Sequence, residues 1–131
     1  TKNMVQADTF ALLEDVGLVD QANSVSGTLS YGFQKQLELG ITLASDPEIL
    51  MLDEPTAGMS PQETTNSIAL IERISRERGL TLLFTEHDMD VVFSVAEKIT
   101  VLHQGAVLAE GTPENVKNDP DVQRIYLGEA A

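Results

Sequence analysis

An uninterrupted apolar run that ends in two adjacent carboxylates constrains the fold of this chain more than any other segment. The run reads Ile-Leu-Met-Leu at residues 49–52 and is followed by Asp53, Glu54 and Pro55. Continuous apolar runs of this length are typical of strands buried on both faces of a parallel sheet. Because Pro55 cannot donate a hydrogen bond to a neighbouring strand, we expect the strand to end near it. The two acids then lie at the carboxyl end of a strand, where open α/β sheets bind ligands.

Two acids in that position suit a particular chemistry. Asp53 and Glu54 could serve a hydrated Mg²⁺ ion and an attacking water molecule. The alternative is a purely structural strand that is followed by polar residues. The segment taken alone leaves both interpretations open.

A glycine-containing helix start precedes this strand by about twenty residues. Ser30 is a favourable N-cap, and Gly32 permits a close backbone approach. We expect a helix over residues 33–44, whose free N–H groups and positive dipole end form an anion site. The alternative is an ordinary capped helix without a bound anion. In either case, one face of the predicted helix carries Leu37, Ile41 and Ala44, and Leu39 and Leu43 lie beside that face.

A second strand is predicted at residues 81–85, followed directly by Glu86 and His87. A helix should connect the two strands, because Ser60, Pro61 and Glu63 form a helix start and Gly79 is a suitable C-cap. A strand–helix–strand crossover of this kind gives a parallel pair. His87 therefore falls at the same sheet edge as the two acids, either as a catalytic group or as a structural hydrogen-bonding residue.

The rest of the chain shows weaker signals. Predicted elements are a helix at 8–16, a hairpin of residues 98–102 and 106–109, a helix beginning at Thr112, and a last helix at 122–127. His103 lies beside the hairpin turn, and we interpret it as structural.

Charge and composition exclude several classes of function. The 131 residues include 21 acidic and 8 basic side chains, giving a net charge of −13. A nucleic-acid surface needs clustered Lys and Arg, so we expect no nucleic-acid partner. There is no cysteine, and therefore no disulfide framework or thiolate metal site. No apolar run approaches the ~20 residues that a membrane span needs.

Four segments in this order and spacing resemble the nucleotide-binding domain of ABC transporters. Residues 29–36 look like the signature motif, and residues 49–54 look like the Walker B strand with its following glutamate. Residues 57–60 stand where the D-loop lies, and His87 matches the switch histidine. Within the family, Leu-Ser-Tyr-Gly, Thr-Ala-Gly-Met-Ser-Pro and Ile-Tyr-Leu-Gly-Glu most resemble ATPase subunits of branched-chain amino acid uptake systems. Related ATPases for urea or lipopolysaccharide transport share some of these sequence motifs.

The resemblance implies a fold, a reaction and a set of site residues. The expected fold class is α/β, the C-terminal half of a P-loop NTPase domain, with a parallel sheet flanked by helices and part of the helical subdomain. Residues 1–46 would belong to the helical subdomain and residues 47–131 to the ATPase core. The implied assignments are Glu54 and His87 as catalytic, Asp53 as the Mg²⁺ residue, and Ser30, Gly32, Gln34 and Ser60 as ATP-binding residues. An Asp is more usual than Ser60 in the D-loop, and Gln is more usual than Phe33 in the signature motif.

The resemblance also implies partners. The family works as a head-to-tail homo- or heterodimer of ATPase subunits, bound to transmembrane permease subunits at the inner face of the cell membrane. No Gly-x-x-x-x-Gly-Lys-Ser/Thr loop occurs in the sequence. We therefore expect a fragment without ATPase activity of its own. The alternative is a non-catalytic module that only dimerises or binds partners.

Overall fold

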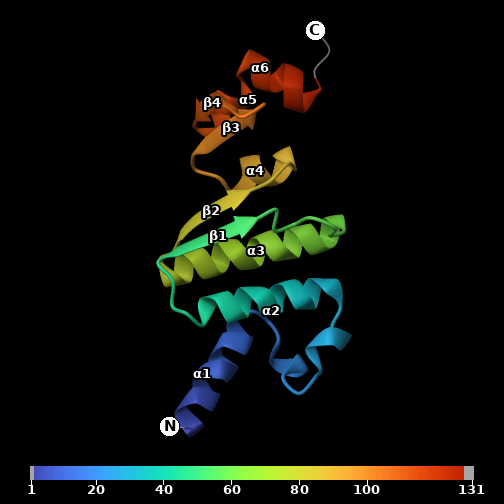
Figure 1. The fold of residues 1–131 in the computed structure, drawn as a ribbon, viewed down its shortest axis with the longest axis vertical. Coiled ribbons are helices and arrows are strands. Elements are labelled where there is room, and N and C mark those ends of the chain that lie inside the picture. Colours follow the sequence, from blue (N-terminus) through green and yellow to red (C-terminus); the bar gives the residue numbers. More distant parts are fainter. Residues whose placement is uncertain (1, 129–131) are drawn as a thin grey trace. The chain divides into compact units, whose positions relative to one another are not determined.

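The computed structural model describes residues 2–128 and separates them into two compact units. The first extends to Thr85 and the second begins at Glu86. Figure 1 shows the elements of both units. The predicted division at residue 46 concerns subdomains of an intact ATPase and stays a prediction.

The first unit is a two-stranded sheet with helices. In chain order its elements are α1 (Lys2–Asp15), η1 (Val19–Gln21), η2 (Ser26–Thr28), α2 (Tyr31–Leu43), β1 (Ile49–Asp53), α3 (Pro61–Arg78) and β2 (Thr81–Thr85). Helix α3 lies between the strands and α2 (Figure 1). The core forms where these elements meet, and its buried side chains are Val16, Leu18, Leu39, Leu43, Leu50, Ile71 and Ile74.

The two strands form the predicted parallel pair. Ile49 lies opposite Thr81 and Asp53 lies opposite Thr85, so the carboxyl ends of β1 and β2 are level. The connecting helix α3 begins with a capping box between Ser60 and Glu63. It ends at Gly79, which has a φ of 63° in the left-handed region. The expected crossover is confirmed.

The prediction that β1 is buried on both faces is wrong for the described residues. Leu50 is fully buried, whereas Ile49 is 58% and Met51 is 71% exposed. On β2, Leu83 is 56% exposed. Successive side chains of a strand point to opposite faces. Helix α3 covers one face of the pair, and within the first unit no described element covers the face that carries these exposed side chains.

The apolar residues predicted along α2 differ in burial. Leu39 and Leu43 are buried and Leu37 packs against the same core, while Ile41 is 66% exposed. A Cβ on Gly40 would lie 3.3 Å from the Val16 side chain, so Val16 lies close against this helix.

Helix α1 is longer than predicted, since it begins at Lys2 and ends at Asp15. Its C-terminal end is joined to α3 by two arginines. Arg73 donates to the Asp15 carbonyl oxygen at 2.7 Å, and Arg78 pairs with the Asp15 carboxylate at 2.6 Å. The Arg73 bond satisfies a carbonyl at the helix end, which has no partner within the helix.

The second unit is built around a hairpin. Its elements are α4 (Met89–Val95), β3 (Ile99–His103), β4 (Ala106–Gly111), α5 (Pro113–Lys117), α6 (Pro120–Val122) and η3 (Gln123–Leu127). The predicted hairpin is confirmed, because β3 and β4 pair antiparallel around a two-residue turn. Both turn residues, Gln104 and Gly105, have positive φ, as a type I′ turn requires.

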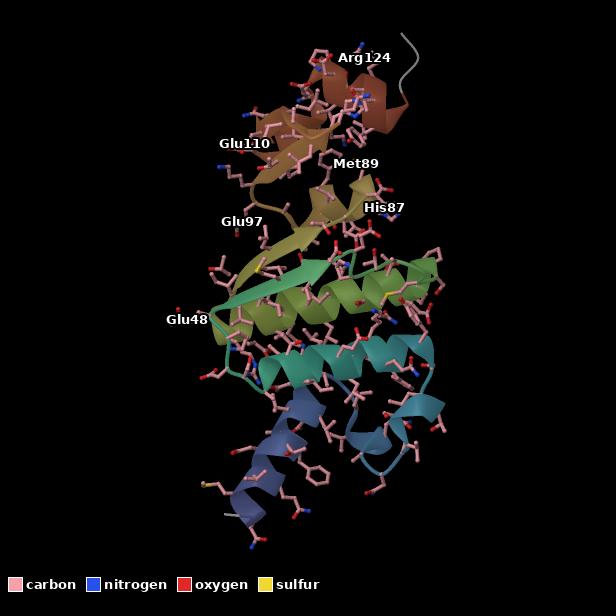
Figure 2. The ribbon with its side chains drawn as sticks, in the orientation of Figure 1. Glu48, His87, Met89, Glu97, Glu110 and Arg124 are labelled. Atoms are coloured by element: carbon pink, nitrogen blue, oxygen red, sulfur yellow. The ribbon has the colours of Figure 1, made fainter. Side chains whose placement is uncertain are left out.

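Side-chain contacts hold the hairpin within this unit. The His103 ring meets the Tyr126 ring edge-on at 6.2 Å, and the Tyr126 hydroxyl donates to the Leu102 carbonyl at 2.6 Å. This packing supports a structural role for His103. On the hairpin, Glu110 (Figure 2) accepts from Thr100 and pairs with Lys98. Both interactions hold the pKa of Glu110 below its ordinary value, with the Lys98 hydrogen bond as the larger cause.

Candidate functional site

Thr85 bonds the Asp53 carboxylate and the Glu54 backbone at the end of β1. Its hydroxyl donates to Asp53 Oδ1 at 2.5 Å and accepts from the Glu54 N–H at 3.1 Å. The same N–H also donates to the Thr85 carbonyl at 3.0 Å. These bonds follow from the register, because Asp53 and Thr85 are partners across the parallel pair. No role for Thr85 was predicted from the sequence, although its position as the last residue of the neighbouring strand pointed to this edge.

Glu54 starts a sharp turn out of the sheet. Its φ is 45°, a left-handed conformation that costs a residue with a side chain about 1–2 kcal/mol. The turn is closed by the Ala57 N–H, which donates to the Glu54 carbonyl at 3.1 Å. Strained backbone of this kind persists where the surroundings hold it in place. The turn leaves Glu54 exposed at the carboxyl edge of the strand pair.

Asp53 suits a cation that keeps most of its water. Its side chain is exposed, and among the described residues no cluster of three or more His, Cys, Asp or Glu could hold a metal ion. Mg²⁺ does not need such a cluster, because it usually takes one or two carboxylates together with waters and substrate phosphates. A single aspartate oriented by a threonine hydroxyl fits that coordination.

The start of α2 lies beside the start of α3. Ser30 caps α2 by accepting from the Phe33 N–H at 3.3 Å, as predicted. A Cβ on Gly32 would lie 3.5 Å from Glu63 Oε1. The two helix starts line a hollow of about 250 Å³ that contains Ser30, Gly32 and Glu63 in its wall. Gln34 points its amide nitrogen to the Ser26 carbonyl at 3.5 Å.

Ser60 is engaged in capping α3. Its hydroxyl accepts from the Glu63 N–H at 3.3 Å, and its own N–H donates to Glu63 Oε2 at 2.8 Å. This reciprocal pair satisfies two N–H groups that the helix leaves without partners. An ATP-facing role for Ser60 stays a prediction.

The capping box predicts a pH dependence. Hydrogen bonds from the Ser60 backbone N–H, and then from its side chain, hold the pKa of Glu63 below its ordinary 4.5. The stabilisation is present above the pKa of the unfolded chain and is lost as pH falls through the lower folded value. In urea unfolding, the wild-type chain should exceed Glu63→Gln in stability by more at pH 7 than at pH 3.

A charge-matched control accompanies that measurement. Glu72→Gln removes the same charge from a later turn of α3. The pH-dependent difference should be smaller for this variant. An equal pH dependence in the two variants would assign the effect to net charge and not to the capping box.

His87 belongs to the second unit, where it precedes α4 and is exposed (Figure 2). The next residue, Asp88, caps α4 by accepting from the Asp90 and Val91 N–H groups. A helix thus begins immediately after His87, as predicted. Its catalytic role stays a prediction.

Comparison with known families decides what kind of protein this is. The family model described as ABC transporter matches residues 2–57, and the model described as branched-chain amino acid ATP-binding cassette transporter matches residues 106–131. The high-affinity branched-chain amino acid transport ATP-binding protein BraF of Pseudomonas aeruginosa is 49% identical over 118 residues. The chain belongs to the ABC transporter ATP-binding family. LivG of Escherichia coli K12, which carries the same description as BraF, is 47% identical over 118 residues.

The matches cover most of this ABC family chain but only part of each relative. The alignments with BraF and LivG include 90% of the chain and 46% of either relative. The chain therefore spans about half the length of the curated relatives that it matches.

Solved structures confirm the predicted fold class. The ADP conformation of an ATP-binding cassette matches with a TM-score of 0.83 and 31% identity, over 94% of this chain and 50% of that chain. A nucleotide-free ATP-binding cassette matches with a TM-score of 0.84 and 31% identity, over 98% and 52%. The fold is that of ABC ATPases, an α/β arrangement with parallel strands and flanking helices. No helix within residues 2–128 has the length and apolar character to cross a membrane.

Proposed function

We propose that this chain forms part of an ATP-hydrolysing subunit that powers an ABC transporter, with branched-chain amino acid import as its process. The observation that carries the proposal is the Thr85 bridge, which holds Asp53 and Glu54 together at the carboxyl end of a parallel strand pair. That edge is where α/β sheets bind ligands. The descriptions of BraF and of the C-terminal family model support the choice of branched-chain amino acids over urea or lipopolysaccharide.

Each acid has a separate task in this proposal. Glu54 accepts a proton from the attacking water and acts as the general base. Asp53 holds Mg²⁺ through its water shell. When bound, Mg²⁺ neutralises charge on the β- and γ-phosphate oxygens. The Thr85 hydroxyl orients Asp53 and anchors the first peptide of the turn that carries Glu54.

His87 is proposed as the hydrogen-bond donor to the γ-phosphate. It follows Thr85 by two residues, and two residues of chain span at most about 7 Å. We propose that His87 acts at the sheet edge where Thr85 bonds Asp53 and Glu54. An imidazole there would stabilise charge on the transferring phosphoryl group.

The start of α2 is proposed to serve a second subunit. Ser30, Gly32 and Gln34 would contact the γ-phosphate of ATP held by the partner in a head-to-tail dimer, with Ser60 near the seam. A capped helix start suits this task because its N–H groups and dipole favour anions. Permease subunits would hold the dimer at the inner face of the cell membrane, and no nucleic-acid partner is proposed.

A chimera tests the proposal directly. This chain would replace the matching part of BraF, and unmodified BraF would serve as the reference. We expect Mg²⁺-dependent ATP hydrolysis by the chimera and none by the chain alone, because the chain has no Gly-Lys phosphate loop. A folded chimera that dimerises without hydrolysing ATP would favour the interaction-module alternative. Hydrolysis by the chain alone would contradict the need for a separate phosphate loop.

Ser30→Arg separates the dimer role from helix capping. In the chimera, the bulky cation should block ATP-driven dimerisation while ATP still binds to the monomer. Size-exclusion chromatography with ATP measures the first property, and equilibrium binding of ATP measures the second. Thr28→Arg, three residues from the dimer-facing start of α2, is the control. Equal loss of both properties would mean that Ser30 only caps α2.

A further inference from the structure

Tyr31 joins two segments that lie 26 residues apart in the sequence. It is the first residue of α2, and its hydroxyl donates to the Ala57 carbonyl at 3.0 Å. Its ring also contacts the next residue of the turn. A Cβ on Gly58, which has a φ of 77°, would lie 3.7 Å from the Tyr31 ring. The tyrosine therefore packs against this turn with both its ring and its hydroxyl.

The turn that Tyr31 contacts is the one that begins with Glu54. The Ala57 carbonyl accepts from Tyr31, and the N–H of the same residue donates to the Glu54 carbonyl at 3.1 Å. A short series of hydrogen bonds thus runs from the start of α2 to the backbone of the acid. Since Glu54 has a strained φ of 45°, its conformation depends on such supports.

The ring of Tyr31 is also held from its own helix. The Lys35 ammonium group, one turn later, lies 5.5 Å from the ring centroid and 3.1 Å from Glu38 Oε2. A cation within about 6 Å of an aromatic ring is attracted to its face. The Tyr31 side chain, which is 46% exposed, thus interacts with Lys35 of its own helix and with the Ala57 carbonyl of the turn.

We propose that Tyr31 is a positioning residue that couples the two ATP sites of the dimer. This inference rests on the proposed function. In a head-to-tail dimer, Ser30 of one subunit contacts ATP bound to the partner, while Glu54 of that first subunit acts on its own ATP. Tyr31 links these two segments inside one subunit, so closure on one ATP restrains the turn that carries the base for the other.

Tyr31→Phe in the BraF chimera tests the coupling, because it keeps the ring and removes the hydroxyl. We expect the Hill coefficient for ATP to fall toward 1. We also expect kcat to fall about two- to tenfold, the equivalent of one net hydrogen bond. Tyr126→Phe is the matched control. It removes a hydroxyl that likewise donates to a backbone carbonyl, that of Leu102, and should leave both values unchanged.

Hydrogen exchange on this chain tests the link without any ATP chemistry. Tyr31→Phe should speed exchange at the Ala57 and Met59 amides, and Tyr126→Phe should not. Unchanged exchange, or an active chimera whose Hill coefficient and kcat do not respond to Tyr31→Phe, would overturn the inference alone. An inactive wild-type chimera would overturn the proposed function and this inference together.

Discussion

Glu54→Gln in the BraF chimera should abolish ATP turnover while leaving ATP binding intact. Glutamine has nearly the same shape as glutamate but cannot accept the proton of the attacking water. General-base catalysis contributes about 10²–10⁴-fold, so we expect kcat to fall by at least about 10²-fold. The hydrogen bonds that shape the turn use the Glu54 backbone, so the fold should persist. Bound but unhydrolysed ATP should then trap the closed dimer.

The same substitution at the other end of β1 provides the control. Glu48 precedes β1, at the opposite end from Glu54 (Figure 2). Glu48→Gln changes net charge equally and should leave kcat unchanged. Turnover is measured as steady-state phosphate release, and trapping as ATP-dependent dimer in size-exclusion chromatography. A near-normal kcat for Glu54→Gln would remove Glu54 from the catalytic role.

His87→Ala should lower kcat by about 10²-fold, the cost typical of losing one hydrogen-bond donor to a transition state. The loss should appear in kcat more than in the ATP concentration at half-saturation, because the proposed contact strengthens during phosphoryl transfer. Single-turnover hydrolysis with excess chimera separates the chemical step from product release.

The second histidine of the chain serves as the matched control. His103 packs against Tyr126 in the hairpin unit, so His103→Ala should reduce thermal stability and leave kcat near that of the unmodified chimera. If His87→Ala retained normal single-turnover hydrolysis, the histidine would be a structural residue at the start of α4.

Local signals made several elements predictable. The bounds of α3 followed from the Ser60 and Pro61 start and the Gly79 stop, since each acts on the residues beside it. The strands over residues 49–53 and 81–85 could be predicted because each is a short apolar run that is followed by polar residues. Their parallel pairing followed from the helix between them. The position of Asp53 and Glu54 at a strand end, and of Ser30 at a helix start, could therefore be predicted before any coordinates.

Burial was predicted less well because it depends on what lies opposite each face. Of the apolar residues predicted along α2, Leu39 and Leu43 are buried in the core that also contains Val16, whereas Ile41 is exposed. The β1 sequence is apolar on both faces, but within the described part of the first unit only the face of Leu50 is covered.

The sequence by itself determined the order of the elements, their caps and the family to which the motifs belong, because these depend on neighbouring residues and their spacing. Only the tertiary structure decided that Thr85 binds both the Asp53 carboxylate and the Glu54 backbone, and that Tyr31 reaches the Ala57 carbonyl. These contacts join residues 26 to 32 positions apart. They depend on the register in which β1 meets β2 and on the packing of α2 beside α3. Both arise from contacts between distant segments, so local sequence signals do not specify them.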